Sequence, residues 1–187
     1  KNCLAMTLYY LKTNVKSAEN AVLYSQGKIY DAIYDFAVSG TLQSDQLPKN
    51  LYGKCQPGIG ANELKRLDYL HSFGGVPIFS NNLLGSIKDI SKEVDFVKTI
   101  ITAEGVEVEF NIAKILPRVK LLDYKKSGIS TTNFLAGNYF VRDIEESFLV
   151  AREVSPLCQS TFVVSSKFRE ACAQKHLNVG FKEVAYS

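Results

Sequence analysis

The sequence predicts an α+β fold, in which a mixed or mostly antiparallel sheet packs against a few helices. Segments with a strand-like pattern outnumber amphipathic helical segments and do not alternate strictly with them, as they would in a doubly wound α/β protein. The order strand, serine, helix, strand occurs over residues 77–99 and again over residues 162–184, which predicts a repeated unit. Since 46% of the 187 residues are hydrophobic, the chain can bury one core, and we expect a single domain over residues 1–187.

The N-terminal third has one clear strand, at residues 8–12 (LYYLK). Residues 18–25 favour neither helix nor strand, and residues 27–36 (GKIYDAIYDF) fit either a strand with a turn or a short helix. Residues 40–60 are rich in Gly, Pro, Asn, Ser and Gln, a composition that predicts an extended loop.

The middle of the chain is expected to begin with a helix over residues 61–73, because leucines recur on one helical face: Leu64, Leu67 and Leu70. Residues 106–110 (VEVEF) alternate apolar and acidic side chains, as a strand with one solvated face does. Residues 112–122 are strongly apolar and are interrupted by a proline. Residues 138–142 and 148–153 are expected to pair as strands around an acidic turn.

The two strand-serine-helix-strand segments align without gaps when Ser80 is placed on Ser165. Each serine follows an apolar strand and is placed to accept a hydrogen bond from an unpaired amide at the helix start. The alignment also puts Phe96 on Phe181 in the returning strands. We expect both phenylalanines to be buried, together with the apolar residues of the two helices: Leu83, Ile87, Phe168 and Cys172.

Composition and charge exclude several classes of function. No apolar run approaches the roughly 20 residues that span a bilayer, so no membrane association is expected. The net charge is only +3, there is no Trp, and basic residues do not alternate with aromatic ones, so nucleic-acid binding is not expected. The start of the chain has no pattern of a secretory signal. Met6 would make a sensible native start, so residues 1–5 are expected to be a disordered or added extension; a processed mature chain is the alternative.

The cysteines favour neither a metal site nor a catalytic one. They contain no C-x-x-C pair, and only two histidines could assist them: the cysteines are Cys3, Cys55, Cys158 and Cys172. No metal and no cofactor is therefore expected. Cys172 lies on the apolar face of the last helix, where a buried, unreactive thiol is the ordinary arrangement. A chain of this size needs no disulfides, so we expect reduced thiols and a cytoplasmic location.

No group of residues makes a convincing catalytic site. Asp143, Glu145 and Glu146 gather between two expected strands, where a solvated turn is the simpler interpretation. The glycines at residues 58–60 and 74–75 are too few for a phosphate loop, and neither group is expected to follow a strand and open into a helix. We therefore expect no catalytic residues.

Three motifs occur between residues 76 and 187. The chain ends in strand, Val-Ser, helix, Gly-Phe, strand, with these residues: Val164, Ser165, Phe168, Gly180 and Phe181. Residues 110–130 lead from a hydrophobic stretch to Asp123 and Ser127, and residues 76–83 join a strand to a serine. In these motifs the chain resembles the bacterial immunity proteins of polymorphic-toxin systems, in the family catalogued as immunity protein eleven. The first seventy residues match that family only loosely.

The resemblance implies a non-enzymatic protein that binds and neutralises a cognate toxin or secreted effector of a contact-dependent or type VI secretion type. It would occlude the active site of the toxin or the path of its substrate. Such binding needs an exposed, complementary surface with a few aromatic anchors. The candidate contact residues are an acidic patch and three tyrosines: Asp143, Glu145, Glu146, Tyr30, Tyr34 and Tyr52.

Two other functions stay open at this point. A small enzyme could use carboxylates, provided that two or more of them converge in an apolar pocket: Glu107, Glu109, Asp143, Glu145 and Glu146. An adaptor or chaperone that loads a secreted effector would also bind a protein, but it would recognise the delivery region of the effector and leave its toxic domain active.

Overall fold

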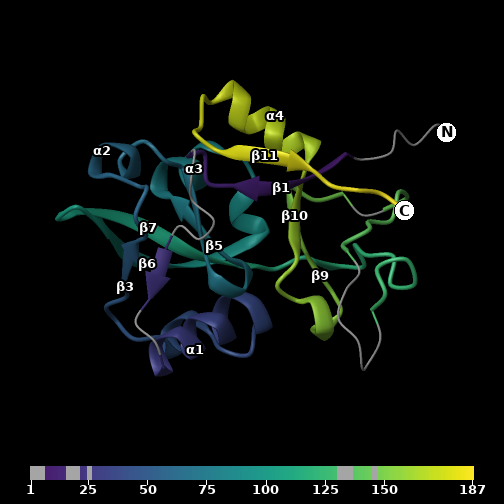
Figure 1. The fold of residues 1–187 in the computed structure, drawn as a ribbon, viewed down its shortest axis with the longest axis horizontal. Coiled ribbons are helices and arrows are strands. Elements are labelled where there is room, and N and C mark those ends of the chain that lie inside the picture. The colour runs from purple at the N-terminus through teal and green to yellow at the C-terminus, as the bar shows by residue number, and fades with distance from the viewer. Residues whose placement is uncertain (1–6, 16–21, 25–26, 130–136, 145–146) are drawn as a thin grey trace.

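The computed structural model describes residues 7–15, 22–24, 27–129, 137–144 and 147–187. Within them the chain forms two sheets, one closed into a barrel and one open, which lie side by side in the left and right halves of Figure 1. The sheets are mixed and short helices pack against them, so the expected α+β class is confirmed. The prediction for residues 1–5 falls outside the described residues.

The barrel strands follow the order β2-β3-β6-β7-β5-β4. Their bounds are Val22–Tyr24 (β2), Tyr52–Cys55 (β3), Tyr69–Ser72 (β4), Val76–Ser80 (β5), Val94–Ala103 (β6) and Val106–Ile115 (β7). The hairpin of β6 and β7 is paired over its whole length. It turns at Glu104 and Gly105, which both have a positive φ, as the favoured two-residue hairpin turns require. Parallel pairing of β2 with β4 and of β3 with β6 completes the barrel.

The open sheet follows the order β11-β1-β10-β9-β8. Its strands are β1 (Leu8–Lys12), β8 (Arg118–Val119), β9 (Val150–Glu153), β10 (Phe162–Ser165) and β11 (Gly180–Glu183). Strand β1, from the start of the chain, lies between the two strands of the C-terminal tail and is antiparallel to both.

The helices flank these sheets. They are α1 (Lys28–Tyr34), continued by a π-helical turn at Asp35–Ser39, and α2 (Ala61–Leu64), α3 (Asn81–Ser86) and α4 (Ser166–Gln174). Short 3₁₀ segments occur at Ser44–Gln46, Phe73–Gly75, Ile90–Lys92 and Pro156–Cys158. In Figure 1, α1 lies below the barrel and α4 lies above the open sheet.

Both expected strand-serine-helix-strand units form, as β5-α3-β6 and β10-α4-β11. In each unit the two strands are separated by one strand antiparallel to both, β7 in the barrel and β1 in the open sheet. Ser80 Oγ accepts the amide of Leu83 at 3.0 Å, and Ser165 Oγ accepts the amide of Phe168 at 3.5 Å. Both serines are therefore N-caps, as the sequence predicted. The four apolar residues expected to be buried are buried: Leu83, Ile87, Phe168 and Cys172.

The prediction that Phe96 is buried is wrong. In β6 it is the alternate positions Thr99 and Ile101 that face the core, so Phe96 faces outward and is 42% exposed. Phe181 is partly buried and packs edge-on against Phe168, with ring centroids 6.4 Å apart. The two units thus share their topology and their serine caps, but not the burial of the aligned phenylalanines.

Three other assignments from the sequence are corrected. The helix expected over residues 61–73 ends at Leu64, and strand β4 follows; the leucines of the expected stripe are buried all the same. The loop expected over residues 40–60 contains β3, because Gly53 lets β3 pass close to its barrel neighbours: a Cβ there would lie 2.6 Å from Val22 Cγ1. Phe140 bridges singly to Leu122 and Tyr186, so residues 138–142 do not pair with residues 148–153. The helical alternative for residues 27–36 is correct.

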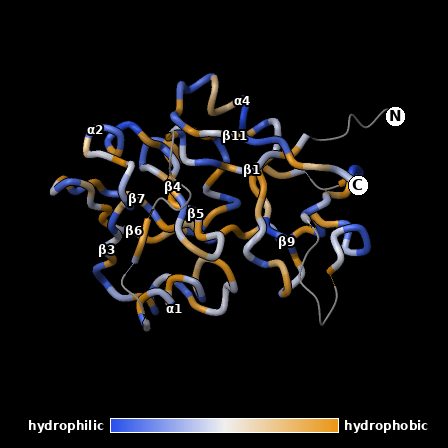
Figure 2. Tube along the Cα trace, viewed as in Figure 1, coloured by the Kyte–Doolittle hydropathy of each residue, from blue (hydrophilic) through white to orange (hydrophobic). Residues whose placement is uncertain are grey.

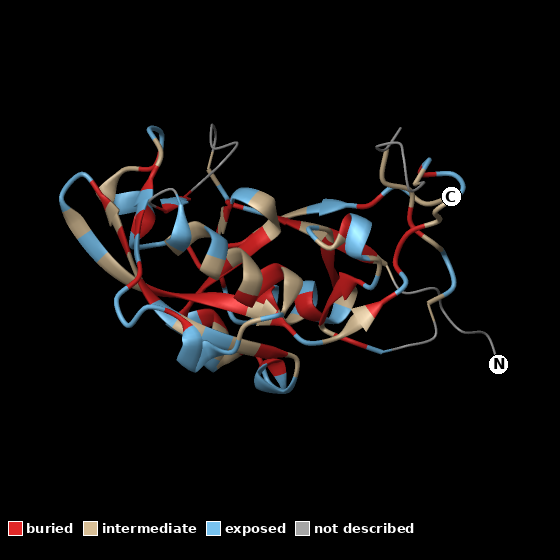
Figure 3. Cartoon of the chain, turned by 90° about the horizontal axis from the view of Figure 1, so that it is seen from below, coloured by how far each residue is buried: buried red, intermediate tan, exposed pale blue. Residues whose placement is uncertain are grey.

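The two halves of the molecule share one of their apolar cores. Figure 2 shows hydrophobic segments along the central strands, and Figure 3 shows that the same interior is buried while exposed residues gather on turns and outer faces. The shared core takes residues from the barrel and from the C-terminal tail, among them Tyr69, Phe79, Phe162 and Phe168.

Asp68 adds a polar link between the two units. It is 7% exposed. Its carboxylate accepts the hydroxyl of Ser80 at 2.5 Å, the side-chain amide of Asn82 at 3.2 Å and the backbone amide of Asn178 at 2.8 Å. Its backbone amide donates to the Asn178 carbonyl and its carbonyl accepts the Ser80 amide. One buried carboxylate therefore fixes the cap of α3 to the segment that leads into β11.

Candidate interaction surface

The structure places the expected contact residues in both halves of the molecule. Tyr30 and Tyr34 lie one turn apart on α1, with ring centroids 6.4 Å apart. Tyr52 lies on the outer face of β3 and is 57% exposed. Asp143 is exposed and belongs to the open-sheet half, because its neighbour Arg142 donates to the carbonyl of Ser187. Glu145 and Glu146 lie outside the described residues. Of the expected contact residues that the structure describes, the tyrosines belong to the barrel half and Asp143 to the other half.

Tyr30, which is partly exposed, and Tyr52 belong to an apolar strip, called here the aromatic belt and made of Leu23, Tyr30, Tyr52 and Phe73. The exposed fractions of Leu23 and Phe73 are 45% and 56%. Leu23 pairs with Lys54 in the β2–β3 ladder, so Tyr52, two residues before Lys54 on the same face, is the diagonal neighbour of Leu23. On its other side, Leu23 lines a groove with Tyr30 and Phe73. The belt is therefore continuous over β3, β2, α1 and the β4–β5 turn.

The groove at the centre of the belt has a volume of about 340 Å³ and is lined by Leu23, Tyr24, Gly27, Tyr30, Ser72 and Phe73. Gly74, with φ 69°, reverses the chain behind Phe73. A Cβ at Gly74 would lie 2.9 Å from the Tyr34 ring and 3.0 Å from the Tyr30 hydroxyl, so only glycine lets this turn approach α1. Burial, with Tyr34 and Asp31 nearby, raises the pKa of Tyr30, which keeps its phenol neutral. The groove suits an apolar side chain of a partner better than a charged ligand.

Arg152 of β9 holds the loops next to the belt. It is fully buried, and its Nη1 donates to the Gln159 carbonyl at 2.6 Å while its Nη2 donates to the Gly75 carbonyl at 3.0 Å. The side chain of Gln159 donates in turn to the Tyr34 hydroxyl at 3.2 Å. The Arg152 Nε has no hydrogen-bond partner among the described residues. Burial, and then the charge of Arg118, lower the pKa of Arg152 to about 9, which leaves the guanidinium charged at neutral pH.

Two more cations lie near the end of α1. Lys114 Nζ donates to the carbonyls of Gly40 and Leu42, and Arg118 Nη2 donates to the carbonyl of Val38 at 2.6 Å. These carbonyls lie at or just beyond the carboxyl end of the helical segment, where a positive charge is favourable. Within the described ranges, no carboxylate lies at salt-bridge distance from Lys114, Arg118 or Arg152.

Three of the five carboxylates considered for an enzyme are described, and they lie apart from one another. Glu109 binds Lys98 at 3.1 Å and Asn81 on the outer face of the barrel. Glu107, on the same strand, is exposed, and Asp143 belongs to the other half. These three carboxylates therefore do not converge in an apolar pocket.

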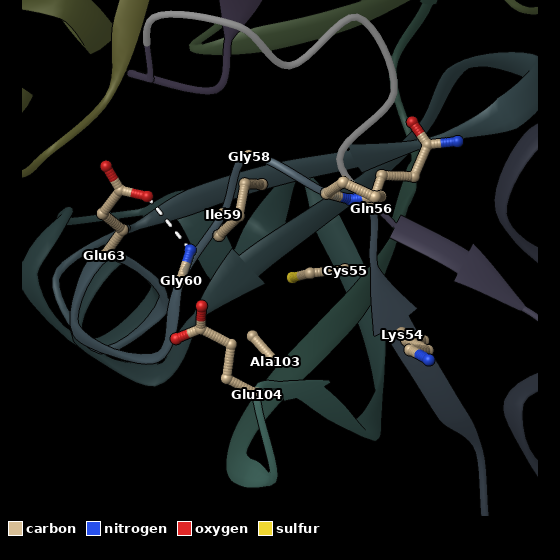
Figure 4. A pocket seen from close by; sticks show the side chains of 10 residues that line it. Lys54, Cys55, Gln56, Gly58, Ile59, Gly60, Glu63, Ala103 and Glu104 are labelled. Atoms are coloured by element: carbon tan, nitrogen blue, oxygen red, sulfur yellow. Dashed lines mark hydrogen bonds between the residues drawn. The ribbon is translucent and has the colours of Figure 1, made fainter.

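The glycines at residues 58–60 do follow a strand and do open into a helix, contrary to expectation, and a cavity of about 530 Å³ lies beside them (Figure 4). The amides of this turn are already occupied: the Gly60 amide donates to Glu63 at 3.0 Å and the Ala61 amide donates to Glu104 at 3.0 Å. Figure 4 shows these two carboxylates on either side of Gly60. They take the place that an anion would occupy and repel it, so the turn is not a phosphate site.

The described cysteines, Cys55, Cys158 and Cys172, are buried and free; Cys3 is not described. Burial raises the pKa of Cys55 to about 11 and that of Cys172 to about 12, so neither thiol is a ready nucleophile. The buried thiol expected at Cys172 is confirmed. In the described part of the chain, no three metal-binding side chains gather, and no helix is long and apolar enough to cross a membrane.

Sequence reasoning did not find Leu23, Phe73 or Arg152. Leu23 and Phe73 are single apolar residues in segments of ambiguous pattern, and their exposure depends on barrel closure. A signal for Arg152 exists, because Arg152 and Glu153 interrupt the apolar run FLVAREV. Glu153 is also fully buried and accepts the amides of Leu121 and Leu122 at 2.9 and 3.0 Å. A charged pair inside an apolar strand thus marks two buried polar networks.

No family model, curated protein or solved structure matches this chain. The resemblance to immunity proteins therefore stays a prediction. Its motif residues have structural roles here. Ser165 caps α4, and Ser127 Oγ accepts the amide of Tyr139 at 3.0 Å. Gly180 lies so close to β1 that a Cβ on it would be 2.9 Å from the Lys12 carbonyl oxygen. These residues build the scaffold, whereas the aromatic belt lies entirely before residue 76.

Proposed function

We propose that this protein is an immunity protein that binds a cognate bacterial toxin or secreted effector and neutralises it by occluding its active site or its substrate path. The single observation that carries the proposal is the aromatic belt. One exposed apolar residue needs no explanation, but the belt combines three exposed apolar side chains with the partly exposed Tyr30, and three of its four residues line one groove. Such a cluster on the wall of a barrel is typical of an interaction surface. The proposal places the protein in the cytoplasm of the cell that makes the toxin, with no catalytic step of its own.

The division between scaffold and surface supports this proposal. The motif residues of the resemblance cap a helix, pin a loop or allow close chain contact, and such roles are the same whatever the partner is. The belt is formed by Leu23, Tyr30, Tyr52 and Phe73, which lie in the part of the chain that matches the family only loosely. Proteins that each recognise a different toxin need a common scaffold and a different contact surface, and this arrangement provides both.

The test begins with the product of the gene adjacent and upstream, expressed as a toxin in cells that also express this protein. We expect growth to be restored and the two proteins to purify as a complex. Leu23→Ala and Phe73→Ala should each weaken the complex at least about tenfold, as the loss of anchoring side chains does. Leu116→Ala is the matched control, because Leu116 is as exposed as Leu23, at 46% against 45%, and lies outside the belt.

Absence of both rescue and complex would contradict the proposal. A complex in which the toxin stays active would identify an adaptor or chaperone in its place. Equal weakening by Leu116→Ala and Leu23→Ala would show that the belt is not the contact surface.

A further inference from the structure

We infer that Arg118, backed by Arg152, is a recognition point for a carboxylate of the protein partner, supplied by an acidic segment that docks beside the aromatic belt. This inference rests on the proposed function and deepens it by naming the chemistry of the partner.

The first support is the position of the two arginines. Strands β8 and β9 are parallel, and Arg118 and Arg152 are direct partners in their register. Direct partners in a ladder project from the same face of a sheet, so two guanidinium groups lie on one side as neighbours. Like charges in this arrangement repel each other and destabilise the sheet. Their repulsion contributes to the lowered pKa of Arg152.

The second support is the missing counter-charge. A buried cation is ordinarily paired with an anion, because desolvation costs several kcal/mol. Arg152 is 0% exposed and is compensated by two carbonyls and by the ring of Phe162, whose centroid lies 5.2 Å from the guanidinium carbon. Its Nε–H finds no acceptor in the part of the chain that the structure describes. Within the described residues, no carboxylate therefore neutralises the charges of Arg118 and Arg152.

The third support is that Arg118 is reachable. Lys114, the third cation of this region, is already held by two carbonyls and lies over the ring of Phe36. Arg118 is partly exposed and spends one Nη2 donor on Val38. A guanidinium has five N–H donors in a planar fork that matches a carboxylate, so Arg118 keeps donors for a bidentate contact. The positive charge of its strand neighbour Arg152 adds to the attraction for an anion.

The fourth support is continuity with the belt. Arg152 binds Gly75, which follows the turn that carries Phe73, and Gln159, which binds Tyr34. Arg118 binds the carbonyl of Val38, one helical turn beyond Tyr34. A single partner segment can therefore place an apolar side chain in the groove and a carboxylate on Arg118. This geometry favours a carboxylate of a protein over a free anion, which would gain nothing from the belt.

A purely structural role for these arginines makes a different prediction, which the isolated protein can test. The full chain is titrated with sodium acetate while the arginine Nε–H signals are followed by proton–nitrogen NMR, with sodium chloride at equal ionic strength as the control. The loss of one signal in Arg118→Gln identifies Arg118. We expect a saturable shift of the Arg118 signal with acetate and none with chloride. No saturable shift, or a shift with inorganic phosphate but not with acetate, would overturn the inference.

The second measurement uses the complex with the toxin. Arg118→Gln should weaken the complex at least about thirtyfold, as removal of one partner of a buried charge pair does, and Arg118→Lys should weaken it less. Lys182→Gln removes the same charge from exposed β11 and should leave the affinity within about twofold. Unchanged binding of Arg118→Gln would overturn the inference and leave the proposed function standing. If the wild-type protein binds no toxin, the proposed function fails, and the acetate titration still decides whether the anion site exists.

Discussion

At the scale of single residues, the two capping serines have unequal surroundings. Ser80 Oγ accepts the Leu83 amide at 3.0 Å and donates to the buried carboxylate of Asp68 at 2.5 Å. Ser165 Oγ accepts the Phe168 amide at 3.5 Å. Loss of a cap costs about 1 kcal/mol, and a buried hydrogen bond to a charged group adds about 1.5 kcal/mol or more.

We therefore expect Ser80→Ala to lower the free energy of unfolding by about 2–3 kcal/mol and Ser165→Ala by about 1 kcal/mol or less. Urea unfolding of the two variants beside the wild-type protein measures the difference. Equal losses would mean that the Ser80–Asp68 bond adds nothing to the cap.

Cys172 gives a prediction about pH. It is 1% exposed, and burial raises the pKa of its thiol from 9.0 to about 12. Between these two values the unfolded chain releases a proton that the folded protein keeps. The free energy of unfolding should therefore fall as the pH rises above 9.0, by up to about 1.4 kcal/mol per pH unit, and this thiol should have no effect below about pH 8.

The measurement is urea unfolding at pH values from about 7 to 10.5, for the wild-type protein and for Cys172→Ala. Burial also raises the pKa values of Tyr24 and Tyr69, but both tyrosines are present in both proteins, so the difference in slope isolates the thiol. Parallel curves would show that Cys172 ionises normally.

At the scale of the elements, a glycine in a turn and a glycine in a helix differ in whether they leave room for a side chain. Gly75 has φ 78° at the β4–β5 turn, and a Cβ there would lie 2.1 Å from the Ser160 carbonyl oxygen. Gly85 lies in α3, and a Cβ there would meet no atom within 4 Å. Gly75→Ala should cost at least about 2 kcal/mol, whereas Gly85→Ala should stabilise the protein by about 0.5–1 kcal/mol.

Thermal unfolding of the two variants measures whether Gly75→Ala lowers the stability and Gly85→Ala raises it. Gly75→Ala should also weaken any contact made by the belt, because the turn that carries Phe73 and the loop bound by Arg152 must move apart. A Gly75→Ala variant as stable as the wild-type protein would contradict this account of the turn.

The elements also show what the sequence could predict. The caps at Ser80 and Ser165, the strand at residues 106–110 and the stripe on α4 follow from local patterns, and all are present. Strand β3 could not be found in this way, because its Gly53 looks like a loop residue until the barrel brings Val22 and Ile101 against it. The leucines of residues 61–73 would be buried in a helix, and they are also buried when part of this segment forms a strand. Only the pairing of β4 with β5 decides between helix and strand.

The candidate site was predictable only in part, for the same reason. Tyr30 and Tyr52 could be selected because tyrosines are concentrated in the part of the chain that resembles the immunity family only loosely. Leu23 and Phe73 could not, because a single apolar residue carries no sign of exposure until barrel closure turns it outward. The pairing of Arg118 with Arg152 depends on a parallel register between segments 34 residues apart in sequence, which no local pattern encodes.

At the scale of the whole molecule, the two halves are joined by the shared apolar core and by Asp68. The core alone is non-directional, whereas the carboxylate fixes one geometry: it binds the Ser80 hydroxyl in the barrel half and the Asn178 amide in the tail. Removing it leaves the buried hydroxyl of Ser80 and the partly buried amide of Asn178 without an acceptor, and a buried group left in this way costs about 1–3 kcal/mol.

We expect Asp68→Ala to lower the free energy of unfolding by about 3 kcal/mol or more, and to speed hydrogen exchange at the amides of both Ser80 and Asn178, which lie in different halves. Asp89→Asn is the control, because Asp89 is an exposed partner of Lys92 and should leave both measurements unchanged. If exchange rose at Ser80 alone, the carboxylate would serve only the cap of α3, and the two halves would be held together by apolar contact without it.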